Sequence, residues 1–416
     1  MATVSASGIG AGQYWRWVLL GLVSAIFFLS TGGAFSTLGV LLPEMISDLD
    51  WNWTQAGAGF TTLALMTGIS STVPAHTMKI GGQKTGIRLV YLTGGALLAA
   101  GFTLFALTDS FVTYLIAAGL VGVGYTQAGA VPAVKLLSSW FDRRRSFVIG
   151  VFFTSGALGS VAAPLAASYF LLSLGSWRLC WAVLAVAILV LSLAAAVLVR
   201  EKTENDDTGE EEGSAHKQDG SDDDWTLAEV LRSPQYYILI AALTVTLLGT
   251  VTMNTWQVAH MQNLGVSAQI AASALSLHAL MNAASRALGG IVIDRIGAKW
   301  VLASGLAAGV VGMTALAHAK TPLLITLFAI GDGYCFGIVT FASAIVLLKY
   351  YGAKNNPAIL GTMNLVSTIA MIGPVLAGYI GDRAGGFSIV FIGVAIMMAI
   401  PFLMIVLMSQ PVRARH

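Results

Sequence analysis

Charged side chains are scarce in this chain of 416 residues. Asp, Glu, Lys and Arg make up only 10% of it, whereas 56% of the residues are hydrophobic. Soluble domains carry about 25% charged residues, so this composition excludes an ordinary water-soluble domain. The net charge of +2 at pH 7 says little by itself, and we expect no nucleic-acid partner. The expected surroundings of the chain are a lipid bilayer.

Cysteine is nearly absent as well. Cys180 and Cys335 both lie in long apolar segments, which excludes a disulfide framework and a cysteine metal site. The glycine-rich patches also lie inside apolar segments, rather than between a strand and a helix where a phosphate would be held. We therefore expect no enzyme activity, no cofactor, no metal and no ATP-driven pumping.

Long apolar runs are the positive signal. Twelve of them are long enough to cross the hydrocarbon core as helices. They cover residues 16–42, 55–77, 86–107, 110–138, 146–172, 177–199, 234–262, 267–293, 299–318, 321–349, 357–381 and 386–409. The fold class predicted from them is an all-α, polytopic membrane protein with twelve transmembrane helices in two pseudo-symmetric six-helix bundles.

Basic residues are distributed unevenly over the loops between these runs. With the N-terminus in the cytoplasm, 17 of the 22 Lys and Arg residues fall on the cytoplasmic side and three on the outer side. This bias fixes the orientation of membrane helices. Both termini are therefore predicted to be cytoplasmic, in a cell membrane that we expect to be a bacterial inner membrane.

An internal repeat and an acidic segment define the domain organisation. The sequence GVGY at 122–125 recurs as GDGY at 331–334, and Pro164 recurs as Pro374, at offsets of 209 and 210 residues. Repeated halves of this kind alternate access to a site between them. The segment 200–233 contains 12 of the 20 acidic residues and is expected to be a solvated tether, or else a regulatory segment. The predicted domains are 1–199, the linker 200–233, and 234–416.

Arg286 is the most unusual residue of the apolar segments. A guanidinium in mid-membrane costs about 2.5–3.5 kcal/mol or more on insertion, and arginine cannot reduce that cost by losing its proton. Its planar fork suits a carboxylate, so we predict that it binds an anionic substrate. The alternative is an arginine that snorkels to the cytoplasmic surface.

Other polar residues of the predicted helices are candidates for the same chemistry. Helical spacing places His278 and Asn282 on the face of Arg286. Asp332 would neutralise Arg286, titrate during transport, or serve as a structural carboxylate. The candidate substrate-binding residues are Arg286, Tyr125, Asn282, Tyr334, Gln127, Trp256 and Asn254. The candidate proton-coupling residues are Asp332, His278 and His260. The alternative role for the two tyrosines and for His278 is packing, and His260 is expected in a wet position near the end of its helix.

A loop motif follows the eighth predicted helix and consists of Gly290, Asp294, Arg295, Gly297 and Lys299. Its charges and tight turn would latch neighbouring helices at the cytoplasmic side. A degraded copy follows the second helix, at Pro74, Met78, Lys79, Gly81 and Lys84. The motif resembles that of the major facilitator superfamily, and the resemblance implies two six-helix halves that alternate access.

Within that superfamily, the chain resembles the monocarboxylate transporters and the oxalate–formate antiporters over essentially all twelve helices. The run WFDRRR at 140–145, followed by Gly150, is similar to the entry of helix 5 in that family. The resemblance implies that Arg286 occupies the position of the family's substrate-binding arginine. Asn282 stands where many eukaryotic members have an aspartate, so their Asp–Arg proton switch is not expected here.

The function predicted from these observations is secondary active transport of a small organic carboxylate by alternating access. Proton symport is favoured over exchange for a counter-anion, and one chain completes the carrier, so a monomer is expected. Two rival functions remain. One is a carrier of neutral or cationic compounds, as in drug efflux, and the other is a nontransporting membrane sensor that signals through the acidic linker.

Deletion of residues 206–220 is expected to leave transport within about twofold of the parent, because a polar, acidic segment without apolar periodicity has little to pack against. Uptake into proteoliposomes, normalised to correctly inserted protein, measures this. An inserted deletion variant without uptake would show that the linker does more than connect two halves.

Overall fold

The computed structural model of the protein describes residues 9–141, 144–199, 225–352 and 355–411, and in them all regular structure is helical. Ten helical stretches are long and apolar enough to cross a membrane. They are Tyr14–Leu49, Thr85–Ala106, Phe111–Trp140, Phe147–Leu174, Trp177–Leu198, Pro234–Asn263, Ala298–Ala317, Pro322–Tyr351, Ala358–Ala384 and Ser388–Leu407. These stretches cover ten of the twelve predicted spans.

Two further long helices complete the set of twelve, and the predicted fold class is confirmed. One runs from α3 (Trp53–Ile69) through the 3₁₀ segment η2 (Ser70–Thr72) into the start of α4 (Val73–Ala106). The other is α11 (Ala268–Ile296), whose mean hydropathy is lowered by polar residues such as His278 and Asn282. Gly82, with φ of 65°, breaks α4 between the second and third predicted spans. The degraded loop motif therefore turns at Gly82, one residue after the predicted Gly81.

Contacts between helices divide the chain into two compact units. The first comprises Met1–Leu41 and Thr62–Ala215, and the second comprises Leu42–Thr61 and His216–His416. This division assigns the end of α2 (Leu38–Leu49) and the first turns of α3 to the second unit, whereas the predicted boundaries place them in the first domain.

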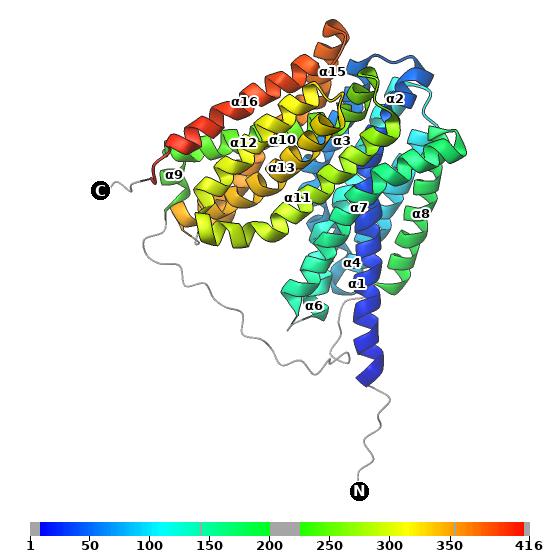
Figure 1. Cartoon of the computed structure of the whole chain (residues 1–416). Helices are drawn as coiled ribbons and strands as arrows, with labels where there is room; N and C mark the ends of the chain where they lie inside the picture. Colours follow the sequence, from blue (N-terminus) through cyan, green and yellow to red (C-terminus); the bar gives the residue numbers. More distant parts are fainter. Residues whose placement is uncertain (1–8, 142–143, 200–224, 353–354, 412–416) are drawn as a thin grey trace. The chain divides into compact units, whose positions relative to one another are not determined.

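In the first unit, α4 lies against both α5 and α8, and α1 lies against α7. The remaining bounds, labelled in Figure 1 where there is room, are α1 (Ile9–Thr31), the π-helical η1 (Gly32–Thr37), α5 (Phe111–Gln127), α6 (Ala130–Trp140), α7 (Arg145–Leu174) and α8 (Trp177–Leu198). The aromatic pair of the helix 5 entry motif is buried: Trp140 and Phe141 are inaccessible to solvent, and the Arg16 guanidinium lies 5.1 Å from the Phe141 ring. That motif therefore packs α6 against the start of α1.

In the second unit, α12 packs against α13 and α16, α11 packs on α13, and α10 packs on α16. Its helices are α9 (Leu227–Val230), α10 (Pro234–Asn263), α11, α12 (Ala298–Ala317), α13 (Pro322–Tyr351), α14 (Asn356–Ser367), the 3₁₀ segment η4 (Thr368–Ile372), α15 (Gly373–Ala384) and α16 (Ser388–Leu407). The start of α3 joins this unit through Asp382 of α15. The two Asp382 carboxylate oxygens accept hydrogen bonds from the backbone N–H groups of Trp53, at 2.9 Å, and Thr54, at 3.0 Å. The backbone N–H groups at the N-terminus of a helix have no partner within the helix, and a carboxylate at that end accepts their hydrogen bonds.

The end of the predicted linker packs on the second unit. The backbone N–H of Trp225 donates to the carbonyl of Tyr351 at 3.1 Å, and Asn355 Nδ2 donates to the Trp225 carbonyl at 2.8 Å. Thr226 and Glu229 form a reciprocal capping box around the short helix α9. Residues 200–224 lie outside the described residues.

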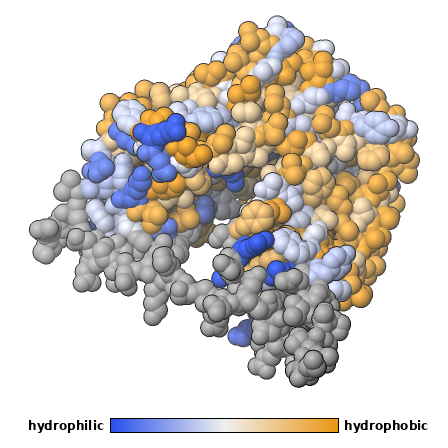
Figure 2. Space-filling view, turned by 60° about the horizontal axis from the view of Figure 1, so that its bottom comes forward, coloured by the Kyte–Doolittle hydropathy of each residue, from blue (hydrophilic) through white to orange (hydrophobic). Residues whose placement is uncertain are grey.

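Apolar side chains cover the outer faces of several helices. On α8, the exposed residues Val183, Val186, Val190, Leu193 and Val197 recur every three or four positions and so form one stripe. A second exposed stripe on α16 consists of Ile389, Ile396, Ile400, Leu403 and Leu407. Figure 2 shows how much of one face is hydrophobic. Such surface is costly in water and suits contact with lipid chains.

The internal repeat is visible in the closest helix contacts, although its register differs from the sequence match. A side chain at Gly122 of α5 would collide with the carbonyl oxygen of Leu63 on α3, and one at Gly333 of α13 would collide with that of His278 on α11. The two glycines make equivalent contacts and lie 211 residues apart, two more than the sequence match predicts.

Gly122→Ala is expected to lower the free energy of unfolding by about 1–3 kcal/mol, because the added methyl group overpacks the α5–α3 contact. Gly119, one turn earlier on α5, has only ordinary contacts at 3.9 Å or more at the position of an added Cβ. Gly119→Ala should be neutral or stabilising, since it also favours the helix. Thermal unfolding in detergent measures both variants, and equal melting temperatures would contradict the close-contact argument.

Candidate functional site

Arg286 lies on α11 with an exposed side chain. Its Cζ atom is 5.1 Å from the centre of the Phe336 ring on α13. Among the described residues, no acid or carbonyl group pairs with this guanidinium. A cation–π contact holds one face of the planar group and leaves its N–H edges available. These edges are suited to bidentate binding of a carboxylate.

Asn282 lies one turn before Arg286 on α11 and is half-buried. Its side-chain oxygen is buried without a hydrogen-bond partner among the described residues. Residues four apart share a helix face, so this amide and the guanidinium can contact one small ligand. Helix α11 therefore provides a fixed cation and a neutral polar group on the same face.

Asp332 and His278 form a buried pair between α13 and α11. His278 Nε2 lies 3.0 Å from Asp332 Oδ2, and the two side chains are 4% and 1% exposed. The atoms are within ion-pair distance, but their angle falls short of a hydrogen bond, and neither carboxylate oxygen has another hydrogen-bond partner in the described chain. The structure places His278, rather than Arg286, beside this carboxylate.

The two predicted tyrosines have different surroundings. Tyr125 lies beside Phe27 and Phe35, with ring centres 6.3 and 5.1 Å away. The Tyr334 hydroxyl is 2.9 Å from the Ser304 hydroxyl on α12. Their predicted equivalence is wrong.

In the register set by the glycine contacts, Tyr125 corresponds to Phe336, the residue beneath Arg286. Sequence reasoning missed Phe336, although its place three residues after Gly333 matches that of Tyr125 after Gly122. An alignment of Gly122 with Gly333 would have identified the aromatic residue beside Arg286.

Three other predicted residues make contacts inside their own units. Trp256 is fully buried, donates from Nε1 to the carbonyl of Pro374 at 2.9 Å, and stacks on Phe387. His260 is 1% exposed and lies 3.0 Å from the carbonyl of Leu316, so the expected wet position is wrong. Gln127 is buried and donates to the hydroxyl groups of Thr77 and Thr93. Asn254 is half-buried on α10.

The loop motif after α11 joins three helices. Gly297, with φ of 90°, ends α11 and begins α12. Lys299 donates to the carbonyls of Val406 and Met408 at 3.0 and 2.6 Å, which fixes the start of α12 to the end of α16. A cation at a helix C-terminus is favourable. Gly290 lies on α11, and Asp294 and Arg295 are exposed in its last turn.

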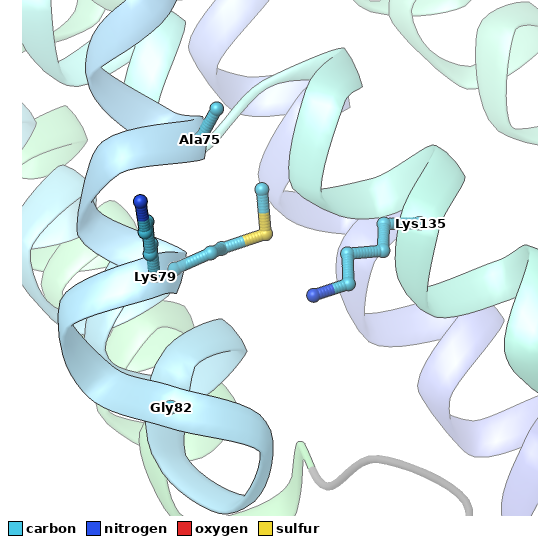
Figure 3. A pocket seen from close by; sticks show the side chains of 5 residues that line it. Ala75, Lys79, Gly82 and Lys135 are labelled. Atoms are coloured by element: carbon cyan, nitrogen blue, oxygen red, sulfur yellow. The ribbon is translucent and has the colours of Figure 1, made fainter.

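The degraded motif of the first unit borders a pocket of about 360 Å³ between α4 and α6, lined by Ala75, Met78, Lys79, Gly82 and Lys135. Figure 3 shows Lys135 reaching from its helix toward α4. None of the predicted substrate-binding residues lines this pocket. A second pocket of about 390 Å³ borders the intact motif and includes Lys299 and Lys349. The residues predicted to bind substrate therefore lie outside both pockets.

Over the part of the chain that the structure describes, twelve long helical stretches, several with lipid-suited outer faces, define a multi-pass membrane protein. The sequence profile of the Major Facilitator Superfamily matches residues 20–258 and 238–416. The chain belongs to this superfamily.

Similar proteins agree with this assignment. The chain is 26% identical to monocarboxylate transporter 13 of Rattus norvegicus over 91% of this chain and 85% of that protein. It is 25% identical to the oxalate:formate antiporter of Oxalobacter formigenes over 72% of this chain and 70% of that protein. A solved bacterial homologue of the lysosomal transporter Spinster, inward-facing and unoccupied, has a TM-score of 0.76 at 14% identity and covers 94% of this chain and 96% of that one. This last likeness concerns the fold alone.

Trp256→Phe is expected to lower the free energy of unfolding by about 1–3 kcal/mol, because the buried carbonyl of Pro374 loses its donor. The KM for substrate should stay within about twofold, since loss of a donor to the protein's own backbone leaves substrate contacts in place. Thermal unfolding and uptake kinetics measure the two effects. A large rise in KM without loss of stability would contradict this prediction and indicate that Trp256 contacts the substrate.

Proposed function

We propose that the protein is a proton-coupled carrier of small organic carboxylates, and that Arg286 binds the carboxylate. The observation that carries this proposal is an arginine on a membrane-spanning helix, held against an aromatic ring and without an acidic partner in the described chain. A permanent cation in such a place is costly unless water or an anion accompanies it. Asn282 and the ring of Phe336 would hold the ligand's polar and apolar parts.

A monocarboxylate suits this site better than a dicarboxylate. One monoanion neutralises one guanidinium, whereas a dianion needs a second cation or a proton. The names of two similar proteins, a monocarboxylate transporter and an oxalate:formate antiporter, support the carboxylate class. Exchange for a counter-anion is the second candidate mechanism, favoured by the antiporter. The proposal includes a monomeric carrier in a bacterial inner membrane, with both termini in the cytoplasm.

Arg286→Ala is expected to lower kcat/KM for carboxylate uptake by about 30-fold or more, which corresponds to loss of about 2 kcal/mol from charge-assisted hydrogen bonds. Arg286→Lys should recover little of it, because an ammonium cannot reproduce the planar fork. The assay is uptake of radiolabelled formate, lactate and oxalate, each tested separately in proteoliposomes.

The matched control is Arg178→Ala, since Arg178 also lies over an aromatic ring, 4.1 Å from Trp177, and pairs with the exposed Asp109. An exposed ion pair contributes little, so this variant should transport normally. Uptake by a folded Arg286→Ala variant at the rate of the parent would refute the anion site. Transport of only neutral or cationic compounds by the parent would refute the carboxylate proposal itself.

A further inference from the structure

The proposed carboxylate site at Arg286 does not use the buried pair of His278 and Asp332. Both side chains are almost inaccessible, and they come from two helices that pack closely, since Gly333 leaves room for the His278 carbonyl. Replacing a buried ion pair by apolar residues often leaves the stability of the folded protein unchanged or raises it. Stability alone is therefore a weak explanation for this pair. We propose that His278 and Asp332 together hold the one proton that is transported with each carboxylate, an inference that rests on the proposed function.

The charge states of the pair explain how it would do so. With one transferable proton bound, the pair is net neutral, as an imidazolium beside a carboxylate or as two uncharged groups. Without that proton, the pair carries one net negative charge. A net charge buried without a partner is strongly unfavourable, so release of the proton requires a state in which water reaches the pair.

The same helix couples this charge to the substrate. Arg286 lies eight residues after His278, which is about 12 Å along α11. In the empty carrier, the guanidinium and the deprotonated pair sum to zero. In the carrier loaded with a monoanion and a proton, both sites are neutral and the sum is again zero. The two half-loaded forms carry a net charge of +1 or −1, and charge inside a low-dielectric bundle makes their reorientation costly. The expected stoichiometry is therefore one proton for each monocarboxylate.

Other ionisable groups on the surrounding helices are already engaged or lie at a distance along the helix. Cys335 is one turn from Asp332 on α13 and beside Thr246 of α10. His260 of α10 is held at the Leu316 carbonyl, Tyr334 of α13 at Ser304, and His318, after α12, at the Thr314 carbonyl. Lys299 at the start of α12 bonds the end of α16. Among the described residues, the pair therefore remains the best-placed proton carrier beside α11.

The test separates net transport from exchange. Asp332→Asn removes the carboxylate, so the pair can no longer carry a net negative charge. The loaded carrier can still reorient, but the empty carrier keeps the uncompensated charge of Arg286. In proteoliposomes with radiolabelled formate, lactate and oxalate, a gradient of one pH unit should drive about tenfold accumulation by the parent. The Asp332→Asn variant should not raise the substrate concentration inside the proteoliposomes above the concentration outside. It should still exchange labelled for unlabelled substrate at a rate within about threefold of that of the parent.

Two further variants keep the outcome decisive. His278→Gln/Asp332→Asn removes both ionisable groups and leaves no buried charge, so it should fold and behave like the single variant. Asp109→Asn removes an exposed carboxylate, 85% accessible, and should retain both accumulation and exchange. Accumulation driven by a pH gradient in either pair variant would overturn the inference. Loss of exchange in a folded pair variant would also overturn it, and so would failure of both pair variants to fold. Either result would show that the pair has a structural role.

A failure of the proposed function gives a different result. A parent protein that transports no carboxylate refutes the function, whatever the pair does. A parent that exchanges carboxylates but ignores the pH gradient keeps the Arg286 site and refutes the assignment of the proton.

Discussion

The cost of ionised groups inside a membrane protein is the constraint on which the site depends. Arg286 keeps its charge at any accessible pH, so its surroundings have to accept a cation. The ring of Phe336 stabilises the cation on one face of the guanidinium, and a bound anion would neutralise its charge. Asp332 and His278 meet the same constraint by pairing with each other. The helices α11 and α13 contribute all four residues, so the contact between these two helices organises both proposed sites.

Small residues make that contact possible. Gly333 and Gly337 of α13 face the main chain of α11 at His278 and Asn282, where any larger residue would force the helices apart. In membranes, helices associate through close packing and polar contacts, because lipid removes the hydrophobic drive between them. The first unit uses Gly122 against α3 in the same way. Repetition of the contact in both units explains why the glycines recur in the sequence.

Much of the fold could be predicted from the sequence, because each membrane-spanning helix leaves a local signal of length and hydropathy. Even α11 could be predicted, although its polar residues lower the signal. The register of the repeat could not be predicted. Aligning Tyr125 with Tyr334 gave the better sequence match, whereas contacts between the main chains of neighbouring helices decide how the helices pack. The partner of Asp332 could not be predicted either, because it lies on another helix 54 residues away in the sequence. Arg286 could be proposed as a site residue because its cost follows from residue type alone, whereas Phe336 is one aromatic residue among many until the helices are placed.

The burial of both cysteines has a practical consequence for observing transport. Cys180 is 4% exposed and Cys335 is inaccessible, and the sequence contains no third cysteine. Thiol reagents act on accessible thiolates, so the native protein offers them little. A single cysteine introduced at a chosen position would then be the main labelled group on an otherwise natural chain. The rate of its alkylation, with and without substrate, would report which surfaces become wet as the carrier works.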